Sequence, residues 1–259
     1  MIEEPYRWVE AIANRREYIE TQLASGSPIA AVSYRDGILF LTLGRSRQKL
    51  FEIYDRIAMG AIGHPGDIER LRMAAIELAS TEGFTRSAAD VSLRRLAHYS
   101  LSPVMKTAFE QVYGAPFLAR LVFAEIGTTP DEDLFLRVEY DGAIATNGNA
   151  VSQTRQNFAV LSASPAATTA MESFLQSEYR ADLDLAGAVR AAADAWSVGH
   201  LGAGADDANA MADRAAVIKH RQEQLTTTGI EAAVLERNTK TMIRYRPLSD
   251  EEARSYISD

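Results

Sequence analysis

Residues 44–78 read GRSRQKLFEIYDRIAMGAIGHPGDIERLRMAAIEL and contain three consecutive pieces: a basic turn, an apolar extended run and an amphipathic helix. The cluster GHPG at residues 63–66 ends the apolar run, because neighbouring glycine and proline residues favour a turn and interrupt a strand. From residue 67 onward the apolar residues recur near helical spacing, and the charged residues fall mostly on the other faces. The segment therefore predicts a short buried strand that leads directly into a helix packed on one side.

Residues 35–56, which overlap the start of this segment, carry a local positive charge in an acidic protein. The cations are Arg35, Arg45, Arg47, Lys49 and Arg56, and the acids are Asp36, Glu52 and Asp55. The whole chain has a formal net charge of -8. Phosphate recognition needs an extended basic face, and one small cluster does not provide it. We therefore expect no nucleic-acid partner.

Length and composition favour a single domain over residues 1–259. A chain of 259 residues with 47% hydrophobic residues can bury a large core, and roughly 75% of its unfolded surface is lost on folding. The absence of cysteine excludes disulfides, thiolate metal sites and a cysteine nucleophile. The N-terminus lacks the apolar core of a signal peptide, and no run reaches the roughly 18 apolar residues of a membrane span. We expect a cytoplasmic protein without membrane association.

Apolar periodicity and turn residues divide the chain into helices and strands. Helical patterns cover residues 6–23, 67–81, 87–112, 165–179, 182–196 and 206–225. Extended patterns cover residues 29–34, 38–43, 51–61, 117–126, 133–140, 143–146, 158–161, 230–236 and 242–246. Pro103 should kink the third helix, and Asp36-Gly37 should close the first hairpin with left-handed turn residues. Hairpin-linked strands with helices in separate groups indicate an α+β fold, in which helices pack outside antiparallel sheets.

No metal or cofactor site is expected from the sequence. The four histidines, His64, His98, His200 and His220, have no second ligand at metal-binding spacing. The glycine-rich run at residues 199–204 follows a helix rather than a strand, so it lacks the context of a phosphate-binding loop. We interpret this run as a connector between helices.

Several segments, taken together in their order and spacing, resemble bacterial proteasome subunits of the α type. They are DGILF, QKLFEIYDRIAMGAIG, ASTEGF, FLARLVFAEIG, LFLRVEYDGAI and GIEAAVLER, and the resemblance extends over about residues 26–246. It implies the four-layer αββα sandwich of the Ntn-hydrolase superfamily, assembled as seven-membered rings. In that assembly two α rings cap two β rings, which hold the proteolytic threonines. The helix expected before the first strand resembles the extra N-terminal helix of α subunits.

Ser27 is the residue that decides between a catalytic and a non-catalytic subunit. The resemblance implies that β subunits use a threonine at the start of the first strand, with its own amine as base. Here Ser27 and Lys49 fall about where that nucleophile and its lysine lie, but residues 42–44 supply no acid. Ser27 also precedes Pro28, behind a helical segment. It is therefore either a helix-terminating turn residue in a non-catalytic subunit, or the N-terminal nucleophile of a self-processing hydrolase.

The resemblance also implies a docking pocket between neighbouring α subunits. Its lysine, matched here by Lys49, pairs with the C-terminal carboxylate of an activator tail that commonly ends in hydrophobic-tyrosine-any residue. Arg45 and Arg47 would raise the positive potential around this lysine. Gly26 matches a pocket glycine, which would let the tail approach the main chain.

Lys49 has an alternative interpretation as a surface residue. It could pair with Glu52 or Asp55, and exposed pairs contribute only about 0–1 kcal/mol to stability. The loop before Lys49 is also shorter than we expect for actinobacterial relatives, which would reshape the pocket.

The resulting prediction is an outer-ring subunit that gates the pore and docks a ring ATPase during protein degradation. Residues 1–25 would form the gate and the N-terminal helix, and residues 247–259 a charged tail. The gate residues would be Met1, Ile2, Glu3, Glu4 and Pro5. The expected partners are identical subunits in a seven-membered ring, β subunits, the C-terminal tail of an AAA+ or other activator, and unfolded substrates in transit. A third possibility is a free-standing ring that meets no β subunit.

Overall fold

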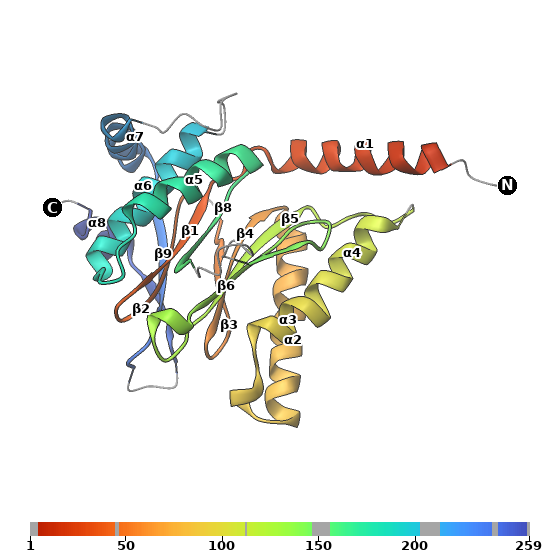
Figure 1. The fold of residues 1–259 in the computed structure, drawn as a ribbon, viewed down its shortest axis with the longest axis horizontal. Coiled ribbons are helices and arrows are strands. Elements are labelled where there is room, and N and C mark those ends of the chain that lie inside the picture. The colour runs from red at the N-terminus through yellow and green to blue at the C-terminus, as the bar shows by residue number, and fades with distance from the viewer. Residues whose placement is uncertain are drawn as a thin grey trace.

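The computed structural model describes residues 5–44, 47–111, 113–146, 156–202, 213–239 and 243–257. Two five-stranded antiparallel sheets lie face to face, with helices outside each of them (Figure 1). The first sheet, in the order β10-β9-β2-β1-β8, contains β1 (Ile29–Tyr34), β2 (Gly37–Leu43), β8 (Phe158–Leu161), β9 (Ile230–Glu236) and β10 (Tyr245–Leu248). The second sheet, in the order β3-β4-β5-β6-β7, contains β3 (Leu50–Tyr54), β4 (Ile57–Gly63), β5 (Ala119–Glu125), β6 (Leu134–Val138) and β7 (Ile144–Thr146).

The helices form the two outer layers. The first sheet is covered by α5 (Pro165–Glu178), α6 (Leu185–Gly202) and α8 (Asp250–Ser255), and α7 (Arg214–Thr227) packs on α6. The second sheet is covered by α2 (Pro65–Thr85), α3 (Leu93–Leu96) and α4 (Ser102–Glu110). Short 3-10 turns occupy Ala88–Asp90 and Pro130–Glu132. The predicted four-layer αββα sandwich of antiparallel sheets is confirmed.

Apolar side chains fill all three interfaces between these layers. The central interface contains Phe40 from β2, Phe135 from β6 and Leu235 from β9, all nearly inaccessible to solvent. Strand β1 is buried along its whole length, because it faces the second sheet on one side and α6 on the other. This double burial explains why its sequence is mostly apolar, with Ser33 as the exception, rather than alternating. No helix within the described ranges has the length and apolarity needed to cross a bilayer.

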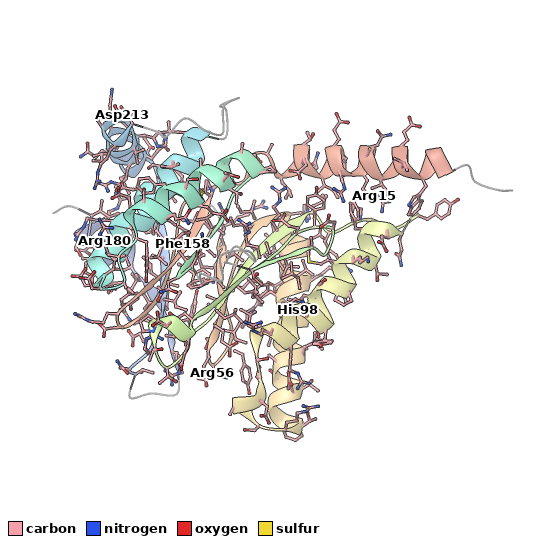
Figure 2. The ribbon with its side chains drawn as sticks, in the orientation of Figure 1. Arg15, Arg56, His98, Phe158, Arg180 and Asp213 are labelled. Carbon is pink, nitrogen blue, oxygen red and sulfur yellow. The ribbon has the colours of Figure 1, made fainter. Side chains whose placement is uncertain are left out.

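Helix α1 (Pro5–Leu23) extends from one end of the sandwich, and its N-terminal end lies farthest from the sheets (Figure 1). Its C-terminal half is anchored by Ile19 and Leu23, which pack with Phe109 and Tyr140. Arg15 points from α1 towards the end of α4 and donates to the Phe109 carbonyl at 2.6 Å (Figure 2). The predicted N-terminal helix is therefore present and is held to the second sheet's side of the molecule.

The first predicted hairpin turn differs from the structure in one respect. The β1–β2 hairpin has the expected strands, but Gly37 is already in β2, paired with Tyr34, so the turn residues are Arg35 and Asp36. Gly37 has no positive φ. A side chain there would instead collide with the Leu235 carbonyl of β9, so close strand approach explains the glycine. The chain has another Asp-Gly pair, Asp141-Gly142, and there the glycine does have a left-handed φ, of 81°.

The predicted helix at residues 87–112 is interrupted in the structure. A 3-10 turn precedes α3, and the π-helical turn Ala97–Leu101 joins α3 to α4, where Pro103 lies in the first turn. Proline has no N–H to donate, so the regular hydrogen-bond ladder cannot pass through it. The break is therefore a change of helix type just before Pro103.

The predicted glycine-rich connector was wrong over its first residues. Helix α6 continues through Gly202, and a side chain at Gly199 would collide with Met171 of α5, so this glycine permits close packing of two helices. Residues 203–212 lie outside the described part of the chain.

Residues 247–257, expected as a tail, complete β10 and form α8, in which Ala253 is fully buried.

Candidate functional site

A cavity of about 720 Å³ lies where the end of α1, the segment before β3 and the start of α2 meet. Its lining includes Gly26, Ser27, Arg47, Lys49 and Glu69. The structure thus brings together three of the four predicted docking residues. Arg45, the fourth, lies outside the described residues, as do the gate residues Met1, Ile2, Glu3 and Glu4, whereas Pro5 begins α1.

Lys49 is held by its main chain and leaves its ammonium without an acid partner in the described ranges. Its N–H donates to Glu231 at 2.8 Å, and its carbonyl accepts from Ala61 at 3.0 Å. Neither Glu52 nor Asp55 pairs with it, and Asp55 lies 3.9 Å from Arg244 instead. Burial lowers the pKa of Lys49, and the charge of Glu231 opposes that shift. The surface-pair interpretation of Lys49 is therefore not what the structure contains.

Gly26 is required by packing within the subunit. Its N–H donates to the Leu23 carbonyl at 2.9 Å and so closes the turn that ends α1. A side chain at Gly26 would collide with the Ile62 side chain of β4. Because this contact forms one wall of the cavity, a larger residue would change the shape of the cavity as well as the packing.

Ser27 is tied into the turn between α1 and β1. Its hydroxyl donates to the Leu43 carbonyl at 2.6 Å and accepts from the Trp196 indole at 2.9 Å. Thr42 lies 3.4 Å away and itself donates to Pro28. Among the described residues, no carboxylate, imidazole or amine hydrogen-bonds to this hydroxyl. The arrangement holds the serine as a structural link and provides no base to activate it.

Two of the four histidines lie side by side in the fold, although they are 20 positions apart in the sequence. His200 Nδ1 of α6 is 3.1 Å from His220 Nε2 of α7, and both rings stack near Trp196. Burial lowers the pKa of both imidazoles. Within the described residues, no group of three or more His, Cys, Asp or Glu side chains could hold a metal ion. The sequence gives no signal for this pair, because helix packing alone brings the two positions together.

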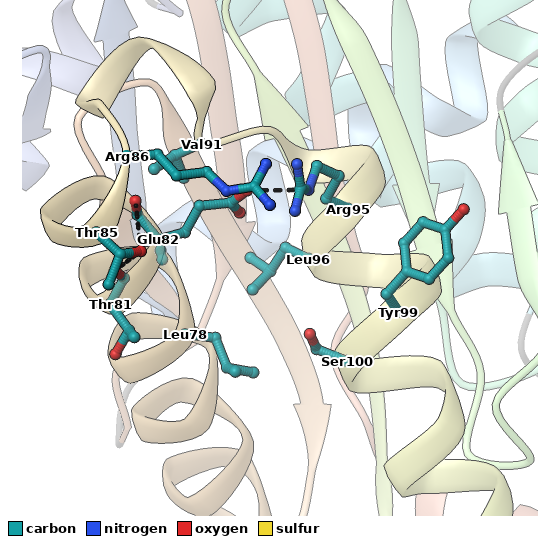
Figure 3. Close-up of a pocket in the computed structure, with 11 residues that line it drawn as sticks. Leu78, Thr81, Glu82, Thr85, Arg86, Val91, Arg95, Leu96, Tyr99 and Ser100 are labelled. Atoms are coloured by element: carbon teal, nitrogen blue, oxygen red, sulfur yellow. Dashed lines mark hydrogen bonds and ion pairs between the residues drawn. The ribbon is translucent and has the colours of Figure 1, made fainter.

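A second cavity, of about 610 Å³, lies between the end of α2 and the α3–π-turn segment (Figure 3). Two of its charged residues form an ion pair, with Arg95 2.9 Å from Glu82. Tyr99 at its edge is 82% exposed. This cavity contains none of the predicted site residues.

Known proteins with similar sequences are proteasome subunits. The proteasome subunit alpha of Actinosynnema mirum is 31% identical over 231 residues, which cover 88% of this chain and 78% of that protein. The chain belongs to the family of bacterial proteasome α subunits. The α subunit of a Nocardioides species is 33% identical over 193 residues, covering 74% of this chain and 70% of that protein. The α subunit of Acidothermus cellulolyticus is 34% identical over 138 residues, covering 52% of this chain and 58% of that protein.

No protein-family model matches this α subunit. The family predicted from the resemblance is nevertheless confirmed by the long match to the relative from Actinosynnema mirum. The name that these relatives share places the chain among the subunits of a proteasome core complex.

Proposed function

We propose that this chain is a non-catalytic subunit of the outer ring of a cytoplasmic proteasome core particle. Seven copies form a ring that stacks on β subunits, gates the passage of unfolded proteins and docks an activator, such as an AAA+ ring ATPase. The observation that carries the proposal is the cavity of about 720 Å³ with Lys49 in its wall. No cofactor is needed for this role.

The chemistry of the cavity suits a single terminal carboxylate. Lys49 is half-buried, and no acid of the described chain pairs with its ammonium. Arg47 adds a second positive charge, while Glu69 is engaged with Arg72 at 2.7 Å. A charge-assisted bond between ammonium and carboxylate is about twice as strong as a neutral hydrogen bond, and partial burial limits its screening by solvent. The C-terminal tail of an activator therefore matches the free charge of this cavity.

The proposed gate consists of Met1, Ile2, Glu3, Glu4 and Pro5, which precede or begin α1. The last turn of α1 lines the docking cavity through Gln22 and Leu23. A helix of 19 residues is about 28 Å long, so α1 is a stiff connection from the cavity to the gate. This connection supports the idea that tail docking and gate position are coupled.

The hydrolase alternative is not favoured by the surroundings of Ser27. A nucleophilic serine needs a base in contact with its hydroxyl, whereas this hydroxyl donates to the Leu43 carbonyl. Native mass spectrometry of the purified protein reports the subunit mass and the ring stoichiometry together. A full-length subunit in a seven-membered or double seven-membered ring is the expected result. A subunit that lacks its first 26 residues would make Ser27 an N-terminal nucleophile and refute the proposal.

The docking role is tested by Lys49→Ala in the assembled particle, with peptidase activity measured with and without activator. We expect normal assembly but loss of stimulation, because one charge-assisted hydrogen bond is worth about 1.5–3 kcal/mol, or at least about tenfold in affinity. Lys219→Ala is the matched control, because this lysine is 78% exposed on α7 and away from the cavity. Stimulation of the Lys49 variant at the level of the control variant would refute docking at Lys49.

A further inference from the structure

The segment at residues 47–50 is a wall between two hollows. On one side lies the docking cavity, and on the other a shallower hollow of about 450 Å³, lined by Glu231 and Tyr245. Glu231 belongs to β9 of the first sheet, whereas Leu50 begins β3 of the second sheet. The carboxylate of Glu231 therefore reaches from the first sheet to the second and contacts residues 49–50 on the side away from the docking cavity.

The carboxylate of Glu231 accepts hydrogen bonds from the main chain of residues 49–50. One carboxylate oxygen accepts from the Lys49 N–H at 2.8 Å and from the Leu50 N–H at 2.9 Å. The other oxygen lies 3.1 Å from the same Lys49 nitrogen. Hydrogen bonds to an ionised acceptor are stronger than neutral ones. The two donors lie at the start of the β3–β4 ladder, whose first paired residue is Leu50.

We propose that Glu231 is the positioning residue of the docking site, which fixes the main chain of Lys49 so that its ammonium stays directed into the cavity. The inference rests on the proposed docking function. Ala61 holds the Lys49 carbonyl at 3.0 Å, so Glu231 completes the restraint of both peptide groups of this residue. A restrained main chain lowers the backbone entropy that this segment would otherwise lose when Lys49 binds a carboxylate.

The charge of Glu231 also acts on the pKa of the Lys49 ammonium. Burial lowers the pKa of the Lys49 ammonium, and the carboxylate of Glu231 is the charge that raises it. The other charged groups at the cavity are Arg47 and Glu69, the latter bound to Arg72. On the Glu231 side, burial and the charges of Glu231 and Glu52 raise the pKa of Tyr245, so the phenol is neutral at physiological pH. Loss of the Glu231 charge should therefore lower the pKa of Lys49, and tail binding should disappear at a lower pH on the alkaline side.

Two substitutions separate the acceptor from the charge. Glu231→Ala removes both, and we expect about tenfold weaker tail binding at neutral pH, which corresponds to about 1.4 kcal/mol. Glu231→Gln keeps one acceptor oxygen for both N–H groups, so neutral binding should stay within about threefold of the parent. The alkaline limb of its binding profile should nevertheless move to lower pH. Glu236→Gln is the matched control, since this carboxylate lies on the same strand but pairs with Arg246.

The probe is a fluorescent peptide that ends in hydrophobic-tyrosine-any residue with a free C-terminal carboxylate, and its amidated form is the negative control. Binding is measured by anisotropy across pH on the full-length protein in its assembled form, with assembly checked by native mass spectrometry. Parent-like profiles for both Glu231 variants would overturn the inference while Lys49→Ala still abolishes binding. Equal loss in both variants, with an unmoved alkaline limb, would show that Glu231 only supports the loop and would also overturn it. Parent-like binding by Lys49→Ala would instead refute the docking function itself. If Glu231→Ala fails to assemble, the Glu231→Gln profile decides alone.

Discussion

Removing one partner of a buried ion pair at the far end of the sandwich should destabilise the fold strongly. Asp133, just before β6 of the second sheet, is inaccessible to solvent, and the side chain of Arg237, just after β9, is only 6% exposed. Arg237 donates to both oxygens of Asp133 at 2.9 Å. Ser33 of β1 donates to the same carboxylate at 2.6 Å, and so does the Gly127 N–H at 2.9 Å. The cluster therefore joins the first sheet to the β5–β6 connection of the second.

Asp133→Ala would leave the Arg237 guanidinium buried without its counter-ion. Breaking one partner of a buried pair costs about 3–5 kcal/mol, and the low exposure of both side chains gives no route for solvent to compensate. For a chain of this size, that cost should lower the melting temperature by roughly 6–20 °C. Thermal unfolding by circular dichroism, at one fixed protein concentration and oligomeric state, measures the effect.

Two further variants make this prediction strict. Glu110→Ala removes an acid that is 54% exposed and lies 3.8 Å from Lys106, so it should change stability by less than about 0.5 kcal/mol. Replacing the pair by Asp133→Ala with Arg237→Met should recover part of the loss, because no buried charge then remains unpaired. If Asp133→Ala melted within about 2 °C of the parent, or the double variant were additive, the assignment of Asp133 as the counter-ion of Arg237 would be refuted.

The remaining predictions concern the cavity and the histidine pair. Gly26→Ala should lower the free energy of unfolding, measured in urea, by about 1–3 kcal/mol and should weaken tail binding, because the new methyl group overlaps Ile62. The loss should be smaller in an Ile62→Ala background, and an unchanged loss would contradict the clash. Burial lowers the pKa of His200 and His220, so the folded state favours the neutral imidazoles. Their contribution to the free energy of unfolding is therefore present above the ordinary histidine pKa of about 6.5 and is lost as the pH falls below it. When the pH is lowered from about 7.5 to about 5.5, the melting temperature of His220→Gln should therefore fall less than that of the parent. An equal fall in both proteins would contradict a role for the pair.

Local patterns were sufficient to predict most of the fold. The bounds of β1 and β8 match the prediction to the residue. Both strands are mostly apolar runs with turn residues on either side, so the turn residues mark where each strand begins and ends. The errors occurred where distant residues set the local structure. Gly37 is glycine because β9 approaches it, and Gly199 because Met171 of α5 does, so neither residue marks the left-handed turn or loop that its type suggests.

The candidate site could be predicted only in part from the sequence. Lys49 and Arg47 are close in sequence, and the resemblance to the family pointed to Gly26. The structure places all three in the lining of one cavity. Glu231 follows Lys49 by 182 positions and has no motif of its own, which is why its contact with the Lys49 main chain was not foreseen. A polar contact between two sheets depends on how the sheets stack, and periodicity within each strand does not report that stacking.

Charged side chains link the two sheets at both ends of β9. Glu231 near its start reaches β3, and Arg237 after its end holds Asp133 of the second sheet. The apolar core between them is non-directional, so it stabilises many small displacements of one sheet against the other. Directional hydrogen bonds at both ends of β9 would fix one position of the first sheet relative to the second. Because the two groups of bonds differ in burial, their loss should affect different properties of the protein. Glu231 is only partly buried beside the cavity, so its loss should change tail docking more than stability, whereas loss of the fully buried Asp133 should do the reverse.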